Sequence, residues 1–498
     1  MTETTRWQRL IPFAFALFIA VAAIAPIRSY DLFWHLATGR WIVEHKVLPA
    51  TDPFTVASDP HLWVNGAWLF QLGAYGLHEA GGLAGLSIAR GLFAALIFLL
   101  ILYASRHVNR DVPPREYAHV ALLLAVVAFA GASPVLDVRP ASVAMLFVIA
   151  AFVVRSPLGL AVLSIVWINT HPSALLAPLL AGLTTRRILP AVASLTGLLV
   201  NPYGIRALIA PLELMTYVRS GEFVNAEWLP SPPLLFPLLY FCIAIGAIAI
   251  VLNIRSNHLE ESGAARISRL ILFALFSYLA ARHVRNQVLF FAAFPILITP
   301  LVRPSHIPRR AAWLVSASII LLLALTGDHR LGVTPDRFPL DAVARLREAG
   351  FSGNIYNPDQ FGGFLIWSLD SERRVLTDGR NELYRIYIPE YAAARGDQRR
   401  WRELLEKYEI DLAVEEYGAP VTAMSGVSGE TSMMPASLAY WPRDRWALIG
   451  FDSAAMVFAR RAAFPEEQIA RWEIRDVVPD DPSIRARQMG RDSTSVER

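Results

Sequence analysis

Cysteine and charge are both scarce in this sequence. The 498 residues include one cysteine, Cys242, inside an apolar run, which excludes a disulfide framework and a cysteine-based metal cluster. Only 18% of the residues are charged while 54% are hydrophobic. The mean hydropathy of +0.40 is far too apolar for an ordinary soluble enzyme. The composition therefore predicts an α-helical protein that crosses a membrane many times.

Three familiar binding motifs are also missing. The chain has no glycine-rich nucleotide loop, no set of metal ligands at a fixed spacing and no basic stripe of the kind that binds nucleic acid. We therefore expect no nucleic-acid partner, and we disfavour a soluble nucleotide-sugar as a donor substrate.

Apolar runs long enough to cross, or nearly cross, about 30 Å of hydrocarbon occur about eleven times. The first run lacks a signal-peptide cleavage site and is expected to be retained. With a cytoplasmic N-terminus, the arginine-rich short loops all fall on the cytoplasmic side, as the positive-inside rule requires. We therefore expect a multi-pass protein of the inner (cytoplasmic) membrane. The runs are 10–27, 84–104, 117–132, 141–154, 157–169, 172–185, 188–200, 233–254, 267–281, 287–302 and 311–327.

The runs 157–169 and 172–185 are each too short to be an ordinary span. If they formed one span, every later loop would change sides and the arginines of 303–310 would lie outside. We therefore expect two short or re-entrant segments that line a cavity. Asn169 and His171, which lie between them, would then face the outer side.

The chain is expected to have three parts. Residues 1–328 form the transmembrane module, whose first outer loop, 28–82, is rich in interfacial helices. Residues 329–463 have the composition of a soluble α/β domain, which an odd number of spans places outside the cytoplasm. Residues 464–498 form a charged, partly ordered tail. Within the domain we expect helices at 340–349 and 398–407, a strand at 411–414 and a hairpin from 446–449 to 455–458.

Asp31 follows the first apolar run directly, in an acidic and aromatic stretch. A carboxylate so close to the end of a span is costly to desolvate, which favours a functional role. If the stretch is helical, Asp31 and His35 lie on one face, where they can hold a shared proton, a substrate hydroxyl or a metal ion. The alternative is an ordinary polar cap at the membrane interface.

Further motifs are distributed along the chain, and together they resemble the GT-C superfamily of integral-membrane glycosyltransferases. The likeness is to a bacterial group of poorly defined substrate and, more distantly, to the acidic first-loop motif of oligosaccharyltransferases. In one departure, Ala67 stands where relatives often carry an acidic residue, which counts against tight metal binding. The matching motifs are Asp31–His35 through Gly39, Asp52–Phe54, Trp63–Asn65 with Trp68–Leu69, Arg139–Pro140, Trp167 with Asn169 and His171, Asn201–Gly204, Glu227–Trp228, Arg282–Asn286, Gly362–Gly363 and Asp378–Arg380.

The resemblance implies an inverting transfer of a sugar from a polyprenyl-phosphate-linked donor to an extracytoplasmic acceptor. Asp31 would be the general base, with His35 and His171 as further catalytic groups. Outward arginines would bind the donor phosphate, because the guanidinium fork suits phosphate oxygens. The resemblance allows a divalent cation, Mg²⁺ or Mn²⁺, as a cofactor but requires none, and no residue is assigned as a metal ligand. The expected substrate-binding residues are Arg139, Arg282, His283, Arg285, Asn169 and Glu227.

Several alternatives remain open from the sequence. The protein can be a transporter or flippase of a lipid-linked glycan, although no internal repeat is evident. It can also be a non-catalytic scaffold of the cell envelope. The outward arginines can simply extend to lipid headgroups, and Asp378 with Arg380 can be a strand-end turn with a local ion pair.

Overall fold

The computed structural model describes residues 3–59, 63–108, 114–221, 226–256, 261–369, 373–417, 422–425 and 431–480. Residue contacts divide the chain into two compact units. We call Met1–Ser29 with Val64–Gly332 the helical unit, and Tyr30–Trp63 with Val333–Arg498 the mixed unit. The expected first outer loop, 28–82, is thus shared between the two units.

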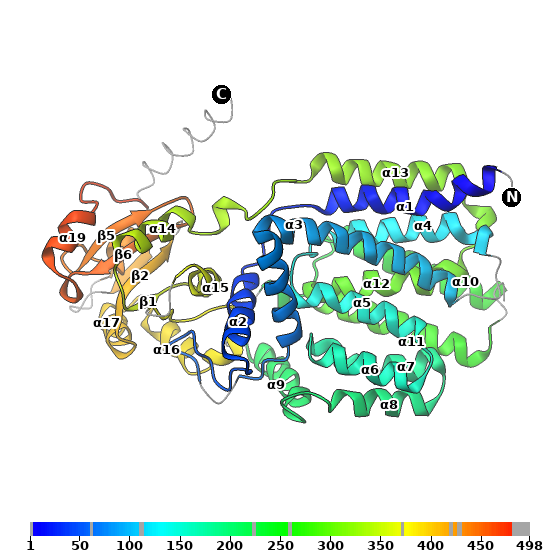
Figure 1. Ribbon diagram of the computed structural model, residues 1–498, viewed down its shortest axis with the longest axis horizontal. Helices are drawn as coiled ribbons and strands as arrows, with labels where there is room; N and C mark the ends of the chain where they lie inside the picture. The colour runs from blue at the N-terminus through cyan, green and yellow to red at the C-terminus, as the bar shows by residue number, and fades with distance from the viewer. Residues whose placement is uncertain are drawn as a thin grey trace. The chain divides into compact units, whose positions relative to one another are not determined.

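Every predicted apolar run of the helical unit lies in a helix (Figure 1). Prolines at the first turns of α5, α6 and η1 fit helix starts, because the missing N–H would have no partner there. The helices and 3₁₀ turns are α1 (Glu3–Ala23), α3 (Trp68–His107), α4 (Pro114–Ala132), α5 (Pro140–Val153), α6 (Pro157–Ile168), η1 (Pro172–Leu176), α7 (Ala177–Thr185), α8 (Ile188–Leu198), α9 (Arg206–Ser220), η2 (Ala226–Trp228), α10 (Pro237–Ser256), α11 (Gly263–Arg282), η3 (Val284–Asn286), α12 (Gln287–Ile298), η4 (Thr299–Leu301), η5 (Pro304–His306) and α13 (Arg309–Thr326).

The expected number of spans is met only in part. Within the described residues, five helical stretches are long and apolar enough to cross a membrane, and the other apolar helices have 10–17 residues. The two short segments predicted around Asn169 and His171 are separate helices, α6 and η1 with α7. The five long stretches are Trp68–His107, Pro237–Ser256, Gly263–Arg282, Val284–Leu301 and Arg309–Thr326.

Helix α12 forms the centre of the helical unit. All of its residues from Gln287 to Ile298 are buried, as expected for a helix that is hydrophobic on every side. It packs against α3, α4, α5, α10 and α11 (Figure 1). The short apolar helices α4 and α5 thus help to cover a buried helix, and their apolar character is explained by this packing as well as by any contact with lipid.

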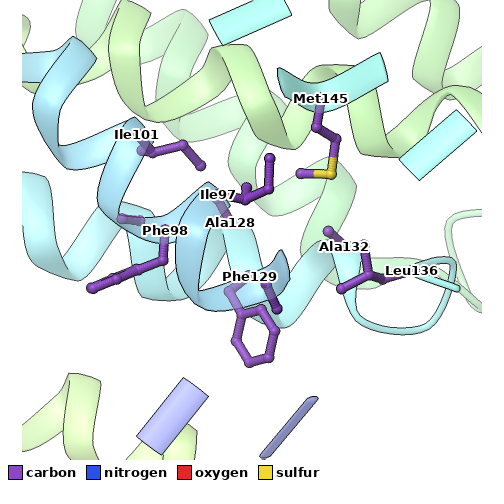
Figure 2. A pocket seen from close by; sticks show the side chains of 10 residues that line it. Ile97, Phe98, Ile101, Ala128, Phe129, Ala132, Leu136 and Met145 are labelled. Carbon is purple, nitrogen blue, oxygen red and sulfur yellow. The ribbon is translucent and has the colours of Figure 1, made fainter. Parts of the chain in front are cut away.

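A small gap remains between α3, α4 and α5. Figure 2 shows the apolar side chains that line it, among them Phe98, Phe129 and Met145. Its volume of about 10 Å³ is roughly that of one water probe, and its walls carry no polar side chain. We therefore regard it as a packing gap and not as a substrate site.

The mixed unit is built on a four-stranded sheet of order β1-β2-β6-β5. β1 runs parallel to β2, whereas β6 is antiparallel to both β2 and β5, with Val414 opposite Val457 and Leu448 opposite Phe458. The strands are β1 (Asn354–Tyr356), β2 (Ile410–Glu416), β5 (Trp446–Phe451) and β6 (Ala455–Arg460), and β3 (Thr422–Ser425) pairs with β4 (Thr431–Met434). The helices are α2 (Asp31–His45), α14 (Leu340–Ala349), α15 (Asp359–Ser368), α16 (Tyr387–Ala394), α17 (Gln398–Lys407), α18 (Ala436–Ala439) and α19 (Glu466–Trp472), with 3₁₀ turns η6 (Pro335–Arg337), η7 (Asn381–Tyr384) and η8 (Arg461–Ala463).

The predicted α/β pattern of this domain is confirmed. Helices α14 and α17 begin and end at the predicted residues, and the predicted hairpin is the β5–β6 pair. Part of the expected tail also folds, since Ile469 of α19 is buried and the Ile474 N–H donates to the Leu448 carbonyl at 2.7 Å. Residues 481–498 of that tail lie outside the described residues.

An acidic side chain, Glu415 of β2, is buried in the aromatic core of the mixed unit. Tyr356 contacts Trp401 and Trp441 there, with ring centroids 5.1 and 5.0 Å apart. The Trp441 indole N–H donates to Glu415 Oε2 at 3.1 Å. Burial raises the pKa of Glu415 to about 7, although Arg395 and the indole act in the opposite direction.

This burial predicts that the protein loses stability as the pH rises from about 5 to about 7. In that window the unfolded chain releases the Glu415 proton that the folded protein still holds, so the unfolded state is favoured. Glu415→Gln keeps an acceptor for Trp441 and should remove this slope, raising stability at pH 8 by up to about 3 kcal/mol. Thermal unfolding of the full-length protein between pH 5 and 8 measures the effect. Glu403→Gln, at an exposed position of α17, should keep the slope; equal slopes in all three proteins would contradict the prediction.

Candidate functional site

The acidic and aromatic stretch after the first apolar run is helical. Helix α2 begins at Asp31, so a negative charge lies at the positive end of the helix dipole. The Trp34 indole N–H donates to Asp31 Oδ1 at 3.3 Å. His35 is buried and its ring lies against that of Trp34, with centroids 3.6 Å apart. His35 therefore supports the tryptophan that contacts Asp31.

The Asp378-Gly379-Arg380 turn lies against Asp31 within the mixed unit. A Cβ atom added to Gly379 would come within 2.4 Å of Asp31 Oδ1. A Cβ added to Gly362 of α15 would come within 1.9 Å of the Thr377 carbonyl oxygen, just before the turn. Gly379 therefore allows the turn to approach the start of α2, and Gly362 allows α15 to approach the turn.

Arg380 forms a buried ion-pair network beside this turn. Its Nη2 lies 2.9 Å from Asp52 Oδ1, and its Nε lies 2.9 Å from both carboxylate oxygens of Asp378. All three side chains are at most 7% exposed. The Trp63 ring covers the guanidinium, with 4.7 Å between Cζ and the ring centroid. The predicted local pair of Asp378 and Arg380 is confirmed, whereas no sequence pattern predicted the bond to Asp52.

The two partners in this network stabilise each other's charged forms. Burial would raise the pKa of Asp52, but the Arg380 guanidinium and hydrogen bonds from Thr55 and the Phe54 N–H outweigh it and lower the pKa. Burial would likewise lower the pKa of Arg380, but Asp378 and Asp52 raise it well above its usual value. Asp52 and Arg380 are therefore both charged over the whole physiological pH range.

A second group of predicted residues lies in the helical unit. Arg139, which precedes α5, forms an ion pair with Glu227 of η2 and donates from Nη2 to the Val135 carbonyl at 2.9 Å. Burial would raise the pKa of Glu227, but Arg139 and then Arg285 outweigh it and lower the pKa. Arg285 lies over the Trp228 ring, with 4.4 Å between Cζ and the centroid. The motifs Glu227–Trp228 and Arg282–Asn286 are thus in contact.

His283 holds these two motifs together. Its Nδ1 lies 2.5 Å from the Trp228 carbonyl oxygen, and the Val284 N–H donates to the Leu229 carbonyl at 3.1 Å. Burial lowers the pKa of His283, and Arg282, Arg285 and Arg219 lower it further, although the bond to Trp228 acts in the opposite direction. Arg282 itself is exposed at the end of α11.

His171 lies in the turn between α6 and η1, within electrostatic range of Arg139 and Arg285. Its Nδ1 accepts a hydrogen bond from the Ser173 N–H at 3.1 Å, so the neutral ring carries its proton on Nε2. Burial, then Arg285 and Arg139, lower the pKa of His171 to about 3. The Nε2 atom is buried and finds no hydrogen-bond partner among the described residues.

Asn169 is bonded to the protein on both sides of its amide. Its Oδ1 accepts from the Trp68 indole at 2.7 Å, and its Nδ2 donates to the carbonyls of Ile165 and Val200 at 2.8 and 3.0 Å. This amide joins the start of α3 to the ends of α6 and α8. In this arrangement Asn169 supports the turn that carries His171.

The predicted site residues therefore fall into two groups. Asp31 and His35 belong to the mixed unit, whereas Arg139, Glu227, Arg285, His283, His171 and Asn169 belong to the helical unit. No group of three or more His, Cys, Asp and Glu side chains that suits a metal ion is found in the part of the chain that the structure describes. Asp52, the other acidic residue of the matching first-loop motifs, is committed to Arg380 and Thr55. These residues do not fit the expected Mg²⁺ or Mn²⁺ site.

Comparison with known proteins identifies the fold. No family model and no curated protein sequence matches the chain. Its structure is similar to the crystal structure of the Archaeoglobus fulgidus oligosaccharyltransferase in the apo form, with a TM-score of 0.50, 11% sequence identity, and coverage of 88% of this chain and 75% of that chain. A second similar structure is the archaeal oligosaccharyltransferase AglB from the same organism, in complex with an inhibitory peptide and a dolichol-phosphate. It has a TM-score of 0.49 and 13% sequence identity, with coverage of 87% of this chain and 75% of that chain. The fold is thus GT-C-like, as the sequence motifs predict.

The closeness of Gly379 to Asp31 predicts a coupled mutational effect. Gly379→Ala adds a methyl group where the Asp31 carboxylate lies, and this overpacking should destabilise the protein by about 1–3 kcal/mol. Asp31→Ala in the same protein removes the obstructing carboxylate, so the double mutant should lose less than the sum of the single losses. Thermal unfolding measures all three variants. Gly263→Ala, where a Cβ meets nothing within 4 Å, is the control, and strict additivity would contradict the contact.

Proposed function

We propose that this protein is a membrane glycosyltransferase of the inverting GT-C type. It moves a sugar from a polyprenyl-phosphate-linked donor to an extracytoplasmic acceptor. The GT-C-like fold and the apolar helices support this proposal. In the proposed topology about eleven apolar segments cross or enter the inner membrane of a bacterial cell envelope, with the N-terminus in the cytoplasm and the C-terminal domain outside.

The observation that carries the proposal is the group of hydrogen-bond donors around His171. A buried N–H without a partner costs roughly 1–3 kcal/mol, and such groups usually have a ligand or another reason to exist. The unpaired Nε2–H of His171 lies within electrostatic range of two guanidinium groups. An anion rich in acceptor oxygens, such as a phosphate, satisfies the N–H and the positive charge together.

In this proposal Glu227 positions an arginine and does not act as a base. Its lowered pKa and its ion pair with Arg139 make it a poor proton acceptor. It orients Arg139 and leaves Arg285, over Trp228, as the second cation for the phosphate. His283 fixes the backbone beside both residues.

Asp31 is the proposed general base. The acceptor hydroxyl oxygen attacks the anomeric carbon on the side opposite the donor phosphate, so a new carbon–oxygen bond forms as the old one breaks. The hydroxyl proton passes to the Asp31 carboxylate, and the negative charge left on the phosphate is stabilised by guanidinium groups. His35 and Trp34 hold the Asp31 carboxylate in position.

Asp31→Asn should abolish transfer, because it keeps the shape of the side chain and removes its basicity. The loss should be at least about 100-fold. The assay follows transfer of label from a radiolabelled polyprenyl-phosphate sugar in membranes that contain the full-length protein. Asp328→Asn, at an exposed carboxylate, is the control and should leave transfer unchanged. Full activity of Asp31→Asn would refute the base, and movement of labelled lipid across the membrane without a new glycosidic bond would identify a carrier.

Arg139→Gln and Arg285→Gln should each weaken donor binding. Losing one charge-assisted hydrogen bond to phosphate should raise the donor KM by about tenfold or more. Initial rates at varied donor concentration measure this change. Arg309→Gln, which removes an exposed positive charge at the start of α13, provides the comparison. An equal KM in all three variants would show that neither Arg139 nor Arg285 contacts the phosphate.

A further inference from the structure

The mixed unit contains a pocket of about 300 Å³ that the proposed reaction does not use. Its size is at the lower end of the range for small-molecule sites. Helix α17 supplies one wall through Gln398, Arg402 and Glu406, which recur at helical spacing on one face. The segment 439–446 and the end of β6 with the two residues after it supply the others.

The floor of this pocket is aromatic and closely packed. Trp401, Tyr440 and Trp446 line it, and each is at most 5% exposed. Trp401 and Tyr440 pack together with ring centroids 4.8 Å apart, and the Trp401 indole N–H donates to the Tyr440 carbonyl at 3.2 Å. An apolar floor below a polar rim is typical of a small-ligand site.

The rim carries more positive than negative charge. Four arginines line the pocket, Arg402, Arg445, Arg460 and Arg461, against two acidic residues, Glu406 and Asp444.

These arginines differ in whether a nearby carboxylate balances their positive charge. Arg461 is paired with the buried carboxylate of Glu473. Arg445 lies 3.8 Å from Asp444 in an exposed pair, which is a weak interaction in water. Arg402 has no ion-pair partner among the residues that the structure describes. Arg460 lies 3.9 Å from Asp411, so of the four arginines the Arg402 guanidinium is the one most available to an anionic ligand.

We propose that this pocket binds a sugar that carries a carboxylate, a hexuronate. The Arg402 guanidinium suits a planar carboxylate, with which it forms two parallel hydrogen bonds. The Glu406 and Asp444 carboxylates and the Gln398 amide accept hydrogen bonds from the sugar hydroxyls. Inorganic phosphate at neutral pH offers few such donors to the oxygens of Glu406, Asp444 and Gln398, so the sugar hydroxyls distinguish the hexuronate from it. If the proposed function holds, the hexuronate is a unit of the acceptor glycan. The binding of the hexuronate to the pocket does not itself depend on the proposed function.

The test is direct binding to the full-length protein in lipid nanodiscs. Ligand-observed NMR compares methyl glucuronide with methyl glucoside, which differs at the carboxylate. Methyl glucuronide should bind at least about tenfold more tightly, and added salt should weaken it. Arg402→Gln should weaken binding by about tenfold, whereas Arg399→Gln, on the same helix but outside the pocket, should not change it.

Three results would overturn the proposal: equal binding of the two glycosides, equally tight binding of inorganic phosphate, or the same effect from Arg402→Gln and Arg399→Gln. The Arg139→Gln variant separates this proposal from the proposed function, since Arg139 does not line the pocket. The variant protein should bind methyl glucuronide as tightly as the unaltered protein, while its KM for the donor rises. Methyl glucuronide binding in a protein that transfers no sugar would support the pocket and refute only the transferase.

Discussion

One buried guanidinium, that of Arg380, holds two carboxylates whose positions in the chain are far apart. Asp52 lies 328 residues before it and Asp378 two residues before it. Taking three charges out of water is expensive, and only their pairing, the added hydrogen bonds and the Trp63 ring offset that cost. Because a partial network would leave a charge unpaired, the stretch that carries Asp52 and the turn that carries Asp378 and Arg380 must come together. This constraint fixes the chain around Asp31 within the mixed unit, where the Asp378-Gly379-Arg380 turn meets its carboxylate.

Local patterns were sufficient to predict most of the secondary structure. The β5–β6 hairpin and helix α17 were evident because two short apolar runs separated by a turn, and charged amphipathic spacing, are properties of neighbouring residues. Span length was harder to predict, since a buried helix such as α12 and a lipid-facing helix are equally apolar. The grouping of 30–63 with the C-terminal domain was not predictable, because it depends on the long-range bond between Asp52 and Arg380.

The site was predictable as a set of residue types but not as a set of contacts. Arg139 and Arg285 stood out because arginine on the outer side opposes the usual charge bias. Nothing local indicated that Arg139 would pair with Glu227, 88 residues away, or that Arg285 would cover Trp228. Asn169 was expected to bind substrate, yet its amide is bonded to three groups of the protein. Its long-range partners, Trp68 and Val200, could be identified only from the folded chain.

The ion pairs of Asp52 with Arg380 and of Glu227 with Arg139 bear on which group balances the negative charge of the donor phosphate in the proposed reaction. An enzyme can use a divalent cation or fixed guanidinium groups for this purpose. Asp52, a first-loop carboxylate of the matching motifs, is not available to a cation, because Arg380 and Thr55 occupy its oxygens. Ala67 removes a further carboxylate from the motif. Glu227, beside Arg285, is itself paired with Arg139. The arrangement of charge in this chain therefore favours guanidinium over a metal ion as the partner of the leaving phosphate.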